Sequence, residues 1–140
     1  MGILVGMLAA CAGETPKNLG VKGGSLAGCP SSPNCVASQA TDQGHRLEPL
    51  SFRGDPDSAF ARLKGVLSLR SDTTLIEGDE RYLRVEFRTR LGFVDDGEFL
   101  LDRERRVIHL RSAARLGYSD LGKNRSRLED IRREFSATLP

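Results

Sequence analysis

Four segments of strand character follow one another between residues 73 and 112, and only short turns separate them. The clearest is Tyr82–Thr89, in which Leu83, Val85 and Phe87 alternate with charged residues. Such alternation is typical of a strand with one buried and one solvated face. The other three segments are 73–77, 98–102 and 107–112. Because connections this short join neighbouring antiparallel strands, the sequence predicts an antiparallel meander.

Two amphipathic helices are predicted to flank the meander. Asp55 and Pro56 suit the N-cap and first position of a helix that ends near Ser71. A second helix, over 121–135, follows from the spacing of its apolar residues Leu121, Leu128, Ile131 and Phe135. With an edge strand at 46–52, the order is strand, helix, four strands, helix. We therefore expect an α+β fold, in which an antiparallel sheet of four to five strands is packed on one face by two helices.

The length and composition fit one modest domain, which we assign to residues 29–138. The chain has 140 residues, of which 39% are hydrophobic and 29% charged, as in globular proteins. No apolar run reaches the roughly 18–20 residues that cross a bilayer. The formal net charge of +2 gives no argument for a nucleic-acid partner, and none is expected.

Residues 1–11 read M-G-I-L-V-G-M-L-A-A-C, an apolar run that resembles the end of a secretory signal. Leu8–Cys11 is similar to the bacterial lipobox, in which the cysteine is acylated and becomes the first residue after cleavage. No Lys or Arg precedes the apolar run, so either translation begins upstream or the signal is weak. The alternative is a buried N-terminal strand or helix.

On the lipobox interpretation, Cys11 carries a lipid anchor and the protein lies in the cell envelope, on the periplasmic side. Ala12 follows the cysteine, which by resemblance to Gram-negative sorting favours the outer membrane. Buried acyl chains would contribute about 0.8 kcal/mol per methylene to this attachment. Residues 12–28 contain few large apolar side chains, so their composition predicts a flexible tether.

Cys29 and Cys35 lie six positions apart with two prolines between them. In an exported chain a disulfide is the expected state, and closing so short a loop contributes about 2 kcal/mol. Free thiols and a metal site are the alternatives. A structural zinc site takes four ligands and a second cysteine pair is absent, so no metal and no other cofactor is expected.

Three acidic residues, Asp95, Asp96 and Glu98, occur within four positions. Arg111 and Arg115 come at the end of a segment expected to neighbour them, so a cross-strand ion network is one interpretation. Such a network would hold the loop around Tyr118 in place. A solvated turn and a catalytic or metal-binding carboxylate group are the other two interpretations.

The polar stretch continues into the start of the second predicted helix. Ser119 or Asp120 can cap that helix, or Asn124 if it begins later. Cations in a first helical turn oppose the helix dipole, which is tolerable if an anion binds there or if the side chains reach into water. The cations concerned are Lys123, Arg125 and Arg127.

Three motifs, Cys29–Val36, Gly92–Phe99 and Ser112–Arg127, together resemble the bacterial and plastid family called domain of unknown function 1499, DUF1499. The resemblance covers about residues 28–136. It implies an exported, lipid-anchored or membrane-linked protein, in agreement with Cys11, and it brings no activity or catalytic residue. Ala37 stands where many relatives have serine, which argues against a hydroxyl role there.

We expect a binding or structural module of the envelope, with an anion or polar-ligand site, whose partners are the membrane and an unidentified envelope ligand or protein. The alternative is a hydrolase that uses Asp95, Asp96 or Asp120 with Arg115. The third hypothesis is a purely structural role for the loop, with binding through the opposite face of the sheet. Binding is preferred because no pair of nucleophile and base is visible. The candidate ligand-binding residues are Asp95, Asp96, Glu98, Arg111, Arg115, Tyr118, Ser119, Asp120, Asn124 and Arg125.

Overall fold

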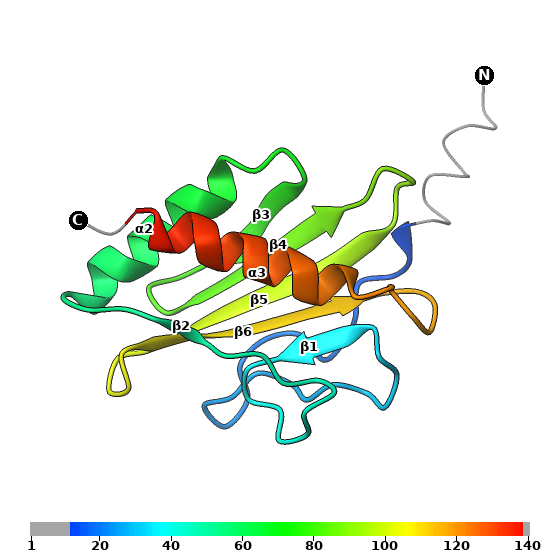
Figure 1. Cartoon of the computed structure of the whole chain (residues 1–140), viewed down its shortest axis with the longest axis horizontal. Coiled ribbons are helices and arrows are strands. Elements are labelled where there is room, and N and C mark those ends of the chain that lie inside the picture. The colour runs from blue at the N-terminus through cyan, green and yellow to red at the C-terminus, as the bar shows by residue number, and fades with distance from the viewer. Residues whose placement is uncertain (1–11, 139–140) are drawn as a thin grey trace.

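The computed structural model describes residues 12–138, so Cys11 and the lipobox lie outside the described residues. These residues form one antiparallel sheet in the order β1-β6-β5-β4-β3, with β2 also paired to β6, and two helices cover one face of it (Figure 1). The elements are β1 (Cys35–Ala37), β2 (Leu50–Ser51), α2 (Pro56–Ser68), β3 (Thr73–Gly78), β4 (Tyr82–Arg88), β5 (Val94–Asp102), β6 (Val107–Ala114) and α3 (Lys123–Ser136).

The α+β prediction is confirmed, with six strands where four to five were expected. The additional strand is β1, whose three residues are too few to show an alternating pattern. The start of α2 is also as predicted, because the Asp55 carboxylate accepts a hydrogen bond from Ser58 N at 2.8 Å. No helix within residues 12–138 is long and apolar enough to cross a membrane.

The predicted strand began at residue 98, with the two consecutive aspartates in the turn before it. In the structure these aspartates lie inside β5. That strand begins at Val94, and Asp95 and Asp96 pair with β4 and β6 along its length. Side chains alternate between the faces of a strand. Asp95 therefore shares the helix-covered face with the core residue Phe99, and Asp96 shares the other face with Glu98.

Residues 20–28 lie against the sheet face that the helices leave uncovered. Gly20 N donates to Glu98 Oε2 at 2.7 Å, and the Gly28 carbonyl accepts from Arg111 Nη2 at 3.2 Å. Leu26 is buried against Tyr82 and Leu100. A tether was predicted for 12–28, and the structure differs for 20–28, because this segment fills an apolar site and pairs with buried polar groups of the sheet.

A disulfide joins Cys29 to Cys35, as predicted for an exported chain. Cys35 opens β1 and is fully buried, so the short loop is fixed to the sheet at its second cysteine. His45 holds the same loop from outside, because its Nε2 lies 2.8 Å from the Ser32 carbonyl oxygen and its Nδ1 lies 2.6 Å from Asp42 Oδ2.

The two contacts of His45 predict that the stability of the fold depends on pH. The hydrogen bond to the Ser32 carbonyl, followed by that to Asp42, raises the pKa of His45 above its usual value of about 6.5. The resulting stabilisation is fully present below about pH 6.5 and is lost as the pH rises through the folded-state pKa. Titration by NMR should give a pKa above 6.5 that falls toward 6.5 in Asp42→Asn; an unchanged pKa in that variant would contradict the contact.

At Gly97 the backbone of β5 lies very close to the core side chains of Phe87 and Val85. A Cβ at this position would lie 2.4 Å from Phe87 Cε2 and 2.8 Å from Val85 Cγ2. We expect Gly97→Ala to lower the free energy of unfolding by about 1–3 kcal/mol, because the core must shift to admit a methyl group. Urea denaturation measures this loss.

Gly65 provides the matched control for that variant. It lies within α2, and apart from its chain neighbours and the nearby backbone of that helix no atom is within 4 Å of a Cβ built there. Gly65→Ala is expected to raise the free energy of unfolding by up to about 1 kcal/mol through helix propensity. Two variants of equal stability would show that the β5 backbone does not approach Phe87 so closely.

Candidate functional site

A pocket of about 300 Å³ opens at the end of the sheet where β4 turns into β5 and β6 leads into α3. One wall is the 89–93 hairpin, and the other is the 115–122 loop. Its apolar lining includes Leu91, Phe93, Leu116 and Leu121, and its polar lining includes Asp95, Ser119, Asp120 and Lys123. Asp95 of the acidic cluster and Ser119 and Asp120 of the loop around Tyr118 therefore line the same pocket.

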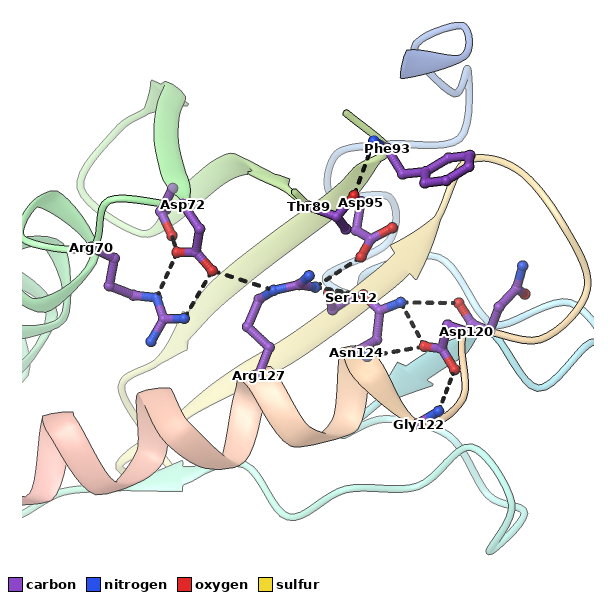
Figure 2. A network of polar contacts seen from close by, with 12 residues as sticks. Arg70, Asp72, Thr89, Phe93, Asp95, Ser112, Asp120, Gly122, Asn124 and Arg127 are labelled. Carbon is purple, nitrogen blue, oxygen red and sulfur yellow. Dashed lines mark hydrogen bonds and ion pairs between the residues drawn. The ribbon is translucent and has the colours of Figure 1, made fainter. Parts of the chain in front are cut away.

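The Asp95 carboxylate lies at the base of the pocket and pairs with an arginine of α3. Arg127 Nη1 donates to Asp95 Oδ2 at 2.9 Å (Figure 2). Within residues 12–138 no hydrogen bond reaches Oδ1, the second carboxylate oxygen. Burial raises the pKa of Asp95, although the charge and hydrogen bond of Arg127 oppose the rise, and the nearby charge of Asp120 adds to it.

Asp120 uses both of its carboxylate oxygens to start α3. Oδ1 accepts from Gly122 N at 2.9 Å, and Oδ2 accepts from Asn124 N at 3.0 Å and Asn124 Nδ2 at 2.8 Å. Burial alone would raise the pKa of Asp120, but these hydrogen bonds outweigh it and hold the pKa below its usual value. Asp120 is therefore an ionised cap of the helix, as predicted, although Gly122 occupies the N-cap position itself.

Asn124 is fully buried and links three parts of the fold. Its Oδ1 accepts from Ser112 Oγ of β6, and its Nδ2 donates to Asp120 and, at 3.5 Å, to the Asn34 carbonyl in the disulfide loop. The side chain of Asn34 in turn donates to the Gly117 carbonyl at 2.8 Å. These hydrogen bonds hold the 115–122 loop against β6 and the disulfide loop. Asn124 therefore positions a wall of the pocket without lining it.

Arg127 was expected in water as one reading, and the structure buries it instead. Its guanidinium lies 4.6 Å above the centre of the Phe87 ring. It also lies 3.8 Å from Asp72 Oδ2, and Arg70 binds the same carboxylate (Figure 2). The signal was present in the sequence, because Arg127 falls on the same helical stripe as the buried residues Asn124, Leu128, Ile131 and Phe135.

Asp96 faces the opposite side of the sheet and forms a separate network there. Arg115 donates to both of its carboxylate oxygens at 2.8 Å and to Glu86 Oε2 at 2.9 Å. Arg84 lies 3.6 Å from Asp96 and 3.8 Å from Glu86. The hydrogen bond to Asp96, against the effect of burial, raises the pKa of Arg115, so this arginine stays charged.

Glu98 forms the second part of that network. It is fully buried and accepts from the Tyr82 hydroxyl at 2.6 Å and from Arg111 Nη1 at 3.3 Å, in addition to Gly20 N. Burial, followed by the hydrogen bond to Glu98, raises the pKa of Tyr82, so the phenol remains a donor. Sequence reasoning missed Tyr82 and Gly20, because their partners are distant in the chain.

The sheet therefore divides the ten candidate residues. Asp95, Ser119 and Asp120 meet in the pocket, Tyr118 is exposed on the same loop, and Asn124 is buried beside the pocket without lining it. Arg125 points elsewhere and donates to the carbonyls of Arg46 and Gly44. Asp96, Glu98, Arg111 and Arg115 lie on the other face. In the described part of the chain, no group of three or more His, Cys, Asp or Glu is placed to hold a metal ion.

Comparison with known proteins gives a family and no activity. A search of curated proteins and a search of solved structures each found no match to the chain. The family model described as "Protein of unknown function (DUF1499)" matches residues 25–135, which include all six strands, α2, all but the last residue of α3 and both walls of the pocket. The chain belongs to the DUF1499 family.

Proposed function

We propose that this protein is an exported, lipid-anchored module of the bacterial envelope that binds a small ligand in the pocket between the 89–93 hairpin and the 115–122 loop. The observation that carries the proposal is the Asp95 carboxylate, which has one oxygen without a partner among the described residues at the base of a largely apolar cavity. A cavity of about 300 Å³ is at the small end of the range for ligand sites.

The contacts of the basic residues indicate which kind of ligand fits the pocket. Arg111, Arg115 and Arg127 each bind a carboxylate, and Arg125 donates to two carbonyls. Lys123 lines the pocket and is exposed, so it is the cation of this group that has no carboxylate partner within residues 12–138. The remaining hydrogen-bonding capacity at the base of the pocket is the acceptor Oδ1 of Asp95. A small amphipathic molecule with a hydrogen-bond donor, such as an amine or hydroxyl group, therefore fits the site better than an anion.

Export and anchoring are supported by residues 1–11 and by the disulfide, which is typical of oxidising compartments. Labelled palmitate should be incorporated into the wild-type chain in bacterial cells and not into Cys11→Ala. Equal labelling of the two chains would contradict the anchor and would leave the pocket proposal untouched.

The pocket can be tested with small probes followed by NMR of the backbone amides. We expect hexylamine and hexanol to shift the amides of Asp95, Ala114 and Leu116 more than hexanoate does. Asp95→Asn should weaken the binding of hexylamine about tenfold or more, because it removes a hydrogen bond to a charged group. Asp102→Asn, at the other end of β5, is the control. Tighter binding of hexanoate, or no effect of Asp95→Asn, would contradict the proposal.

A hydrolase is the second candidate, because Asp95 and Asp120 share the pocket and their pKa values are displaced in opposite directions. Against it, both oxygens of Asp120 cap α3, and Asp96 lies across the sheet. Ester hydrolysis that is abolished by Asp95→Asn, with the fold intact, would favour the enzyme over the binding module.

A further inference from the structure

The exposed apolar side chains of this domain are concentrated on the two walls of the pocket. Within residues 12–138, five of the eight large apolar residues that are exposed belong to the 89–93 hairpin or the 115–122 loop. Leu91 is 76% exposed and Leu121 is 96% exposed. Contiguous apolar surface of this kind marks a contact site, whereas single exposed leucines are ordinary. The five residues, which we call the apolar tips, are Leu91, Phe93, Leu116, Tyr118 and Leu121.

Leu121 is an exposed apolar residue whose backbone conformation is unfavourable for a residue with a side chain. Its φ is 55°, a left-handed conformation that residues with a side chain rarely adopt. The side chain nevertheless points into solvent and makes almost no contact within the domain. Packing inside the described chain does not account for this residue, whereas contact with an external apolar phase does.

The described chain begins beside these tips. A Cβ built on Gly13 would lie 3.1 Å from Arg115 Cβ and 3.2 Å from Leu116 Cγ. Figure 1 shows the start of the described chain at the same end of the sheet as the β4–β5 hairpin and the loop before α3. The residues that precede Ala12 in sequence are the apolar run 1–11. Position 11, where the proposed lipid anchor is attached, therefore directly precedes a part of the described chain that lies beside the apolar tips.

The charges around the tips are mostly positive. Arg88, Arg90 and Lys123 are exposed there, whereas Asp95 and Asp120 are turned inward to Arg127 and to α3. Glu14 is an exposed acid near the start of the described chain. Apolar side chains ringed by basic ones are the pattern of surfaces that lie in the interface of a bilayer containing anionic lipids.

We infer that the apolar tips insert into the interfacial region of a lipid bilayer, so that the pocket opens toward the membrane. The apolar tips would be a second attachment to the membrane, in addition to the proposed anchor at Cys11. This inference rests on the proposed function in one respect, since the anchor would keep this end of the domain at the bilayer. A bilayer is favoured over a second copy of the chain because the proposed acyl anchor at Cys11 and the basic residues both suit lipid.

The absence of tryptophan from the sequence makes the test direct. Leu91→Trp and Leu121→Trp each place one fluorophore in a tip, and Glu104→Trp places one in the β5–β6 turn at the opposite end of β5. The chains begin at residue 11, as after cleavage at the lipobox, and all carry Cys11→Ala. They are mixed with vesicles of phosphatidylcholine and phosphatidylglycerol with brominated acyl chains. We expect blue-shifted and quenched emission for Leu91→Trp and Leu121→Trp, and unchanged emission for Glu104→Trp.

Equal quenching of all three fluorophores, or quenching of none, would overturn the inference. A blue shift that needs no vesicles and grows with protein concentration would assign the tips to a second copy and would overturn it as well. Because every chain lacks Cys11, these outcomes are independent of acylation. Quenching at the tips without palmitate labelling of the wild type would remove the proposed anchor and keep the membrane contact.

Discussion

Arg115→Ala is expected to lower the free energy of unfolding by about 3–5 kcal/mol, as measured by urea denaturation. The variant leaves the Asp96 carboxylate, whose side chain is 1% exposed, without its bidentate partner, and Glu86 beside it adds a like charge. Arg84 lies 3.6 Å from Asp96 and makes no hydrogen bond to it, so it does not supply the two bonds of 2.8 Å that Arg115 makes. Arg115→Lys should recover only part of the loss, because an ammonium group cannot make the same forked contact.

Arg125→Ala is the control for this prediction. Arg125 comes from the same polar stretch of sequence, but it donates to two carbonyls on an exposed loop and pairs with no carboxylate within residues 12–138. Its loss should stay within about 1 kcal/mol. Similar losses in the two variants would show that Arg115 is not buried against Asp96, and the anion-site interpretation of Arg115 would regain support.

Arg127→Ala is expected to have an effect of similar size, about 3–5 kcal/mol near neutral pH. It removes the partner of Asp95, whose side chain is 6% exposed, together with the guanidinium above the Phe87 ring. Arg133→Ala, which removes an exposed pair on the same helix, should cost less than about 1 kcal/mol.

The loss in Arg127→Ala should also shrink as the pH falls. Burial already raises the pKa of Asp95, and removal of Arg127 raises it further. A carboxyl group with a raised folded-state pKa destabilises the fold above that pKa, and the penalty disappears once the group is protonated. Stability curves of the wild type and the variant should therefore converge toward acid pH. A difference that is constant with pH would mean that Asp95 is not the group left unpaired.

Much of the fold was predictable because its signals are local. The alternation of Leu83, Val85 and Phe87 defined a strand, and Asp55 defined a helix start, since each depends on residues a few positions apart. The segment 20–28 was not predictable in this way. Its order comes from Leu26 packing on Tyr82 and from the pairing of Gly20 with Glu98, 78 positions away in the chain.

The predicted strand order indicated which of the candidate residues lie near one another, but not how they pair. The meeting of Asp95 with the 115–122 loop followed from the order of the strands, whereas the separation of Asp95 from Asp96 depended on where β5 begins. With the strand started at Val94 instead of Glu98, its period of two puts the consecutive aspartates on opposite faces. The apolar tips were missed because their meaning depends on exposure, which the sequence does not give.

The two consecutive aspartates lie on opposite faces of the sheet, and each pairs with a different arginine. Asp95 and Arg127 form the base of the pocket, whereas Asp96 and Arg115 pair on the other face of the sheet. Double-mutant cycles on the free energy of unfolding test this pairing most directly. Asp95 with Arg127, and Asp96 with Arg115, should each show a coupling energy of about 1–3 kcal/mol, while the exchanged pairs, Asp95 with Arg115 and Asp96 with Arg127, should couple by no more than about 0.5 kcal/mol. Exchanged pairs that couple as strongly as the other two would contradict the account.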